Sequence, residues 1–175
     1  SVTVTNVNGC VNTDNMLVTV HPLPVAEAGA EQTICYGQSV TLTASGGIIY
    51  LWSNGNNFAG ITVTPAITSG YTVTVTDNKG CVNTDSVTVT VNLLPIPFAG
   101  NDTAICNGSE ITLQASGGTV YQWSPTTGLS NPFISNPVTN LSVITTYTVT
   151  VTDENNCSAT DYITISINPL PVAEA

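Results

Sequence analysis

Residues 81–95 read CVNTDSVTVTVNLLP, and this stretch decides the fold of the chain. In it, valine alternates with threonine, which gives one apolar and one polar face, the pattern of a half-buried β-strand. A cysteine, a Thr-Asp pair, an alternating run and a closing proline recur in the same order at residues 10–24 and 157–171. Three copies of one pattern predict a tandem repeat built from β-structure.

A longer pattern surrounds this stretch and is also repeated. When residue 21 is laid on residue 92, both copies contain Ala-Gly, Ile-Cys, Thr-Leu, Ala-Ser-Gly-Gly and Tyr-x-Trp-Ser, and both resume as YTVTVTD at Tyr71 and Tyr147. The segment between the tryptophan and YTVTVTD is longer in the second copy. Short β-type runs separated by turn signals are typical of a β-sandwich. The sequence therefore predicts an all-β chain of tandem antiparallel β-sandwiches.

The repeat pattern also predicts the domain organisation. We expect complete repeats at residues 23–93 and 94–169. Residues 1–22 match the end of a repeat and predict the C-terminal hairpin of a truncated preceding copy, whereas residues 170–175 match the start of the next copy. The chain is thus interpreted as a window on a longer tandem array, whose short proline-containing linkers restrict φ and keep successive units extended.

The charge of the chain excludes two classes of partner. It has one Lys or Arg residue against 11 Asp and Glu residues, and its net charge is −10. A surface that binds phosphates needs clustered cations, so we expect no nucleic-acid partner and no attraction to an anionic membrane. No run of 18 apolar residues is present in the sequence, so we also expect no membrane insertion.

Each complete repeat contains two cysteines, which indicates an oxidising, extracellular setting for such a small sandwich. The favoured pairing is within repeats, Cys35–Cys81 and Cys106–Cys157, with the partner of Cys10 lying upstream. A second pairing stays open at this point. If the turn before the second strand and the turn after the penultimate strand lie at opposite ends of a sandwich, Cys35 lies near the following repeat and bonds Cys157 instead.

No residue pattern in the chain predicts catalysis or a cofactor. The single histidine, His21, lies in a linker where the other copies have asparagine, and is interpreted as a solvated residue. The carboxylates of Asp14, Asp85 and Asp161 recur in register and could suggest an acid–base pair. We interpret them as turn residues that bond the local backbone before the last strand.

The acidic residues of the turns are candidate metal ligands. Asp77, Asp153 and Glu154 could bind Ca²⁺, but the spacing of a calcium loop is absent and Asn6 replaces the acid in the first copy. One histidine and no CxxC motif also argue against zinc. We therefore expect no metal.

The aromatic residues divide into two groups. Trp52 and Trp123 alternate with tyrosines and are assigned to the core, although stacking on sugars is an alternative role. Phe58 and Phe133 lie in the variable loop and are better candidates for an exposed contact.

Taken together, the motifs resemble a known family. The string AG-[AN]-[ED]-x-x-I-C-x-G-x-x-[VI]-T-L, followed by Y-x-W-S and Y-T-V-T-V-T-D-x-x-x-C, is similar to the PKD-like or immunoglobulin-like tandem repeats of large surface adhesins of gliding bacteria, which are type IX secreted and gliding-motility-associated. The resemblance covers essentially the whole chain. It implies an immunoglobulin-like or PKD-like seven-stranded sandwich, an extracellular location at the cell surface, and no catalytic residues.

The same resemblance suggests a modification. Asp85-Ser86-Val87 and Asp102-Thr103-Ala104 are similar to the Asp-Ser/Thr-apolar signal for O-glycosylation in this bacterial group, so Ser86 and Thr103 are candidate glycan sites.

The function predicted from these features is structural and non-catalytic: a tandem β-sandwich segment of a long extracellular stalk, adhesin or surface filament. Its expected partners are neighbouring repeats of the same protein, identical chains in a filament, and glycans. The alternative is a carbohydrate-binding accessory module of a secreted enzyme.

Overall fold

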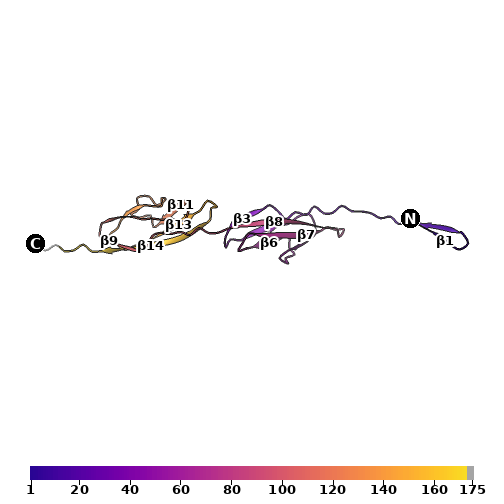
Figure 1. The fold of residues 1–175 in the computed structure, drawn as a ribbon, viewed down its shortest axis with the longest axis horizontal. Coiled ribbons are helices and arrows are strands. Elements are labelled where there is room, and N and C mark those ends of the chain that lie inside the picture. Colours follow the sequence, from indigo (N-terminus) through magenta and orange to yellow (C-terminus); the bar gives the residue numbers. More distant parts are fainter. Residues whose placement is uncertain (173–175) are drawn as a thin grey trace. The chain divides into compact units, whose positions relative to one another are not determined.

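The structure is a computed structural model that describes residues 1–172, and its regular elements are strands (Figure 1). The predicted class, all-β with tandem sandwiches, is confirmed. The expected start of a further repeat at residues 170–175 includes residues 173–175, which lie outside the described residues.

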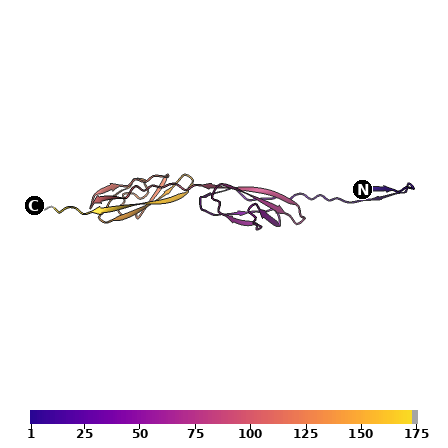
Figure 2. The same cartoon turned by 60° about the horizontal axis from the view of Figure 1, so that its bottom comes forward.

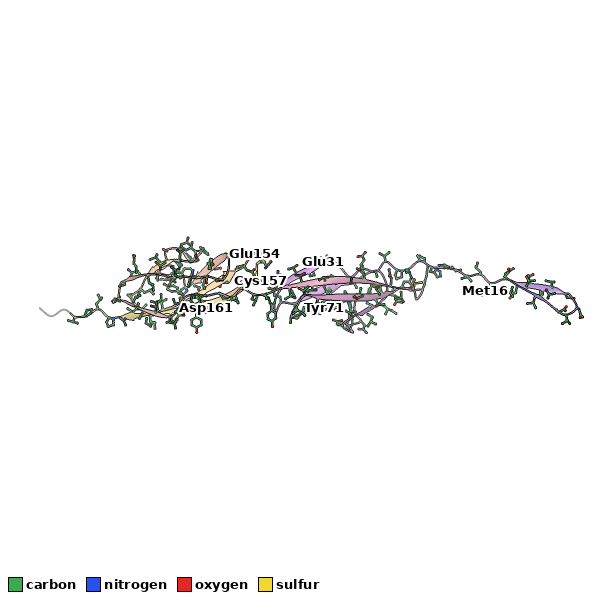
Figure 3. All side chains as sticks on the ribbon, viewed as in Figure 1. Met16, Glu31, Tyr71, Glu154, Cys157 and Asp161 are labelled. Atoms are coloured by element: carbon green, nitrogen blue, oxygen red, sulfur yellow. A yellow bond between two sulfur atoms is a disulfide. The ribbon has the colours of Figure 1, made fainter. Side chains whose placement is uncertain are left out.

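The chain begins with a two-stranded antiparallel hairpin of β1 (Val2–Thr5) and β2 (Val11–Asp14). Its turn is held by the side chain of Asn6, whose Oδ1 accepts hydrogen bonds from the backbone N–H groups of Asn8 and Cys10, each at 3.0 Å. Met16 lies on the segment that follows β2 and is 80% exposed (Figure 3).

The first sandwich has one sheet of order β3-β8-β7-β5 and a second of order β4-β6. Its strands are β3 (Gln32–Cys35), β4 (Val40–Thr43), β5 (Ile49–Trp52), β6 (Gly60–Val63), β7 (Ser69–Thr76) and β8 (Val82–Asn92). The alternation noted in the sequence has the predicted effect in β8, where Val87 and Val89 are buried between half-buried or exposed neighbours.

The second sandwich repeats this strand order, with sheets β11-β13-β14-β9 and β10-β12. The strands of this sandwich are the orange and yellow ones in Figure 2. Its strands are β9 (Thr103–Cys106), β10 (Glu110–Thr112), β11 (Val120–Ser124), β12 (Val138–Asn140), β13 (Thr145–Thr152) and β14 (Ser158–Asn168). Two segments of the chain that share a sequence pattern therefore adopt the same topology.

One feature departs from the predicted antiparallel sandwich. The first and last strands of each sandwich pair in parallel, with Gln32 opposite Val89 in β3 and β8, and Thr103 opposite Ile165 in β9 and β14. Parallel neighbours need a long crossover, and here the intervening strands of the repeat supply it.

Each sandwich has its own apolar core. The buried cluster of the second consists of Ala99, Leu113, Trp123, Leu141, Tyr147, Val149, Val151, Ile163 and Ile165. Residues at most 4% exposed in the first include Ala28, Leu42, Trp52, Ile61, Val73, Val75, Val87 and Val89. Both tryptophans are thus core residues, as the alternation predicted.

The longer loop of the second repeat changes the environment of one core position. Tyr147 is fully buried, whereas the matching Tyr71 is half-buried. The hydroxyl of Tyr147 donates to the carbonyl oxygen of Thr127 at 2.8 Å and lies 3.0 Å from Oγ1 of Thr139, itself buried. Residues of the longer loop therefore satisfy the buried phenol, which would otherwise cost free energy.

The Gly-Gly pair that precedes the third strand of each repeat permits a close backbone approach. Gly117 has a φ of +105°, and a Cβ atom built on it would overlap the carbonyl oxygen of Ile96. Gly46, with a φ of +101°, has the same relation to Val25. A side chain at either position would combine unfavourable backbone geometry with a steric clash, so glycine is required here.

Candidate functional site

The main chemical feature of the structure is a disulfide between Cys35, the last residue of β3, and Cys157, which immediately precedes β14. Cys157 is labelled in Figure 3. Their Cα atoms are 5.6 Å apart, and Cys157 is 1% exposed. Residues Glu31–Val40 belong to the same compact unit as Cys157. Among the described residues, Cys10, Cys81 and Cys106 are free thiols.

The favoured pairing within repeats, Cys35–Cys81 and Cys106–Cys157, is therefore wrong, and the alternative that joins Cys35 to Cys157 is correct. The parallel pairing gives the physical reason. Cys35 lies opposite Asn92 at the C-terminal end of β8, whereas Cys81 precedes the N-terminal end of that strand. A strand of 11 residues spans about 33 Å, far beyond the ~7 Å that a disulfide bridges between Cα atoms.

The repeated carboxylates have a role that sequence reasoning missed. Asp85 Oδ2 accepts a hydrogen bond from the backbone N–H of Ala28 at 2.7 Å, and Asp161 Oδ2 accepts one from Ala99 at 2.9 Å. Ala28 and Ala99 are fully buried at the start of their repeats. The predicted role in the local turn is therefore wrong for these two residues, because each bonds a backbone group about sixty positions earlier in the chain.

Asp77 and Asp153, the acids of the preceding turns, make the local backbone bonds that were predicted for Asp85 and Asp161. Asp77 Oδ1 accepts from the backbone N–H groups of Lys79 and Cys81, at 2.8 and 2.9 Å. Asp153 Oδ1 accepts in the same way from Asn155 and Cys157, at 2.9 Å each. These are Asx-type turns, in which a side-chain oxygen satisfies backbone donors. Of the three acids considered for calcium, Asp77 and Asp153 are thus engaged in local backbone bonds, and Glu154 is exposed.

Replacing Asp161 with alanine is expected to lower the free energy of unfolding of the second sandwich by about 1–3 kcal/mol, because the buried N–H of Ala99 loses its acceptor. Hydrogen exchange of the β13 and β14 amides in increasing guanidinium measures this loss. Asp161→Asn keeps an acceptor oxygen and should retain most of the stability. Equal losses in the alanine and asparagine variants would show that the hydrogen bond contributes little.

The other candidate residues lie apart from one another. His21 is exposed in a segment without regular structure. The indole Nε1 of Trp52 donates to the carbonyl oxygen of Phe58, and that of Trp123 donates to Ile134, each at 3.0 Å. Both tryptophans are therefore unavailable for stacking on a sugar, whereas Phe58 and Phe133 are 69% and 66% exposed.

The two candidate glycan acceptors differ in accessibility. Ser86 is exposed on β8, and Thr103 is half-buried as the first residue of β9. The neighbouring Asp102 accepts a hydrogen bond from the backbone N–H of Thr164 at 2.8 Å. Ser86 is thus the more accessible of the two hydroxyls.

The described part of the chain has neither a cluster of metal-ligating side chains nor a membrane-spanning helix. In residues 1–172, no group of three or more His, Cys, Asp or Glu side chains is placed to hold a metal ion. Across the same residues, no helix has the length and apolar character needed to cross a membrane.

No family model and no curated protein matches the chain. Solved structures do. The insect immune protein hemolin, whose structure is described with implications for homophilic adhesion, is 14% identical with a TM-score of 0.44, and the match covers 89% of this chain and 49% of hemolin. The chain thus spans about half the length of hemolin.

Two further solved structures match the chain with similar identities and TM-scores. Immunoglobulin domains 1–4 of Sidekick-1 are 13% identical with a TM-score of 0.41, over 95% of this chain and 57% of that one. The three N-terminal domains of the highly immunogenic outer capsid protein of bacteriophage RB49 are 19% identical with a TM-score of 0.38, over 83% of this chain and 58% of that one. Similarity at this level does not transfer a function.

Proposed function

We propose that this chain is a structural, non-catalytic segment of a long extracellular stalk, adhesin or surface filament, built from tandem immunoglobulin-like or PKD-like sandwiches. The observation that carries the proposal is the Cys35–Cys157 bond, which joins the first strand of one repeat to the residue before the last strand of the following repeat. A covalent bond from repeat to repeat serves a chain under tension. It also persists in an oxidising compartment outside the cell.

The strand order supports the same role. In each sandwich the first and last strands are parallel neighbours, so the chain enters at one end of this pair and leaves at the other. Tension on the two ends of a repeat therefore acts along the strands, and the paired positions of the parallel ladder, Gln32–Cys35 with Val89–Asn92 in the first sandwich, share the load. A repeat of this kind resists being pulled open.

The N-terminal hairpin is consistent with a longer array of the proposed domains, 23–93 and 94–169. Val2 and Val4 are 59% and 62% exposed, whereas the matching Val73 and Val75 of β7 are fully buried. We infer that residues 1–22 form the last strands of a preceding repeat, whose other strands would cover these valines.

The alternative function, a carbohydrate-binding module, gains no specific support. Such a module needs planar aromatic groups on its surface, and the longer loop of the second repeat contributes one exposed aromatic residue, Phe133. The resemblance to gliding-bacterium adhesins supports neighbouring repeats, identical chains and glycans as partners. Separately, it supports Ser86 and Thr103 as candidate O-glycosylation sites.

Immunogold labelling of intact cells of the source organism tests the proposal. Antibodies raised against the folded chain should label appendages or the surface of unpermeabilised cells, and brief surface proteolysis should remove the label. Labelling that appears only after permeabilisation would contradict an extracellular structural role. An antibody against a cytoplasmic protein serves as the control for cell integrity.

A further inference from the structure

We propose that the Cys35–Cys157 bond is one member of a repeating series. In this series, the cysteine that ends the first strand of each repeat bonds the cysteine that precedes the last strand of the next repeat. Cys106 would then bond a following repeat, and Cys81 a preceding one. The proposal rests on the proposed function, because it requires repeats beyond the two complete ones.

Cys106 has the same backbone setting as the bonded Cys35. Cys35 lies opposite Asn92 in the parallel pair β3 and β8, and Cys106 lies opposite Asn168 in β9 and β14. In both repeats the next residue donates its N–H to that asparagine, at 2.8 Å from Tyr36 and 2.9 Å from Asn107. The two cysteines are thus held by equivalent hydrogen bonds at the end of equivalent strands.

Cys81 likewise has the setting of the bonded Cys157. The N–H of each cysteine donates to the side chain of the turn aspartate, Asp77 or Asp153, at 2.9 Å. The carbonyl oxygen of each accepts from the N–H of the same aspartate at 3.0 Å. The hairpin offers a third example, since Cys10 makes both bonds with Asn6.

A bond between Cys81 and Cys106 themselves would not follow this pattern. In the observed bond, the cysteine at the end of a first strand lies 122 residues before its partner. Cys81 instead comes before Cys106, so the two are placed to bond outward, toward repeats on either side. Every cysteine inside an array would then be paired in the same way.

Cys35 and Cys157 are 122 residues apart in the sequence. The repeats superimpose when residue 21 is laid on residue 92, which is a smaller shift. Successive bonds of the series therefore overlap along the chain. Under tension, the covalent path runs from Cys35 directly to Cys157 and bypasses residues 36–156. At ~3.5 Å per residue, the loop closed by this one bond contains about 43 nm of extended chain. In an array with this series of overlapping bonds, most of the chain stays inside closed loops under force until the disulfides are reduced.

Formation of each bond is an ordinary oxidation. The two thiols lose two protons and two electrons as the S–S bond forms, and a small disulfide such as oxidised glutathione accepts them and becomes two thiols. Folding in a glutathione redox buffer therefore supplies the oxidant.

A concatemer of the chain tests the series directly. Residues 1–168 are followed by residues 22–175 of a second copy, and the junction is native in sequence because PLPVAEA occurs at both linkers. In this protein, Cys106 of the first copy precedes Cys81 of the second by the same number of residues that separates Cys35 from Cys157. After oxidative folding, alkylation and digestion without reductant, mass spectrometry should find these two cysteines joined.

One control variant makes the result decisive. Cys106→Ser in the first copy should leave Cys81 of the second copy open to alkylation while the Cys35–Cys157 bond stays intact. Recovery of both cysteines as alkylated thiols in the unsubstituted concatemer would overturn the series. That outcome would leave the immunogold result untouched, so failure of the series is distinguishable from failure of the stalk function.

Single-molecule pulling on the concatemer tests the mechanical consequence. The oxidised protein should reach its full extension early. Complete reduction should add about 85 nm, because the Cys35–Cys157 bonds of the two copies each bypass 122 residues and the bond between Cys106 and Cys81 overlaps both loops. Equal extensions of the oxidised and reduced protein would overturn the bypass.

Discussion

Replacing Trp123 with alanine is expected to lower the free energy of unfolding of the second sandwich by about 3–5 kcal/mol. The indole is fully buried in a cluster that includes Leu113, Tyr147 and Ile165. Its loss removes the largest apolar side chain of that cluster and leaves a cavity that the surrounding strands fill only in part. The carbonyl oxygen of Ile134 also loses the indole as its donor.

The measurement is hydrogen exchange of the β13 and β14 amides as a function of guanidinium concentration. Trp52 becomes the only tryptophan in this variant and reports separately on the first sandwich by fluorescence. Phe133→Ala is the matched control, because it removes a large aromatic side chain that is 66% exposed and should change stability by at most about 0.5 kcal/mol. Similar effects of the two substitutions would contradict the assignment of Trp123 to the core.

Replacing Gly117 with alanine is expected to destabilise the second sandwich by about 2–5 kcal/mol. The left-handed backbone, with a φ of +105°, costs a non-glycine residue roughly 1–2 kcal/mol. A further ~1–3 kcal/mol comes from the clash, because the added Cβ meets the carbonyl group of Ile96 and lies 3.0 Å from Cα of Pro97. Both neighbours are backbone atoms, so no side chain can rotate to relieve the overlap.

Gly108→Ala separates the two contributions. Gly108 has a φ of +79°, but a Cβ built there meets nothing within 4 Å. Only the conformational cost of roughly 1–2 kcal/mol should therefore be seen. Guanidinium denaturation of the two variants, followed by the same hydrogen-exchange assay, measures the difference. A Gly117→Ala variant no less stable than Gly108→Ala would refute the close approach of the backbone.

The strands of the sandwiches were predictable because their signal is local. The alternation in residues 81–95 specifies which side chains of β8 face the core, and it does so without knowledge of any partner strand. The same logic placed Trp52 and Trp123 inside. The Gly-Gly pairs marked turns, although their close contacts with Val25 and Ile96 depend on segments distant in sequence.

The correct disulfide was only the second of two predicted pairings, because the choice between them depends on which strands are neighbours. An antiparallel sandwich was expected, and the parallel pairing of β3 with β8 carries Cys35 to the end of the sheet remote from Cys81. The sequence does contain a signal for this arrangement. The order of the cysteines is the same in both repeats, so an outward bond from each could have been favoured by its consistency along an array.

The long-range bonds of Asp85 and Asp161 were missed for a similar reason. A Thr-Asp pair beside a turn suggests a local acceptor, and nothing in the neighbouring residues points to a buried N–H at the start of the repeat. Tertiary position, rather than local preference, assigns these carboxylates their donors.

The parallel pairing has a consequence for how the protein is made. Gln32 of β3 finds its partner at Val89, so the opening strand of each sandwich stays without that neighbour until nearly the whole repeat has been synthesised. Contacts of such long range slow folding and prolong the exposure of unpaired edges. In a nascent array, the opening strand also meets the closing strand of the copy before it, which has the same Thr-Asp pair and the same alternating pattern as its own partner. Differences between adjacent copies, such as the longer loop around Tyr147, therefore help each newly synthesised strand to select the correct partner and avoid domain exchange.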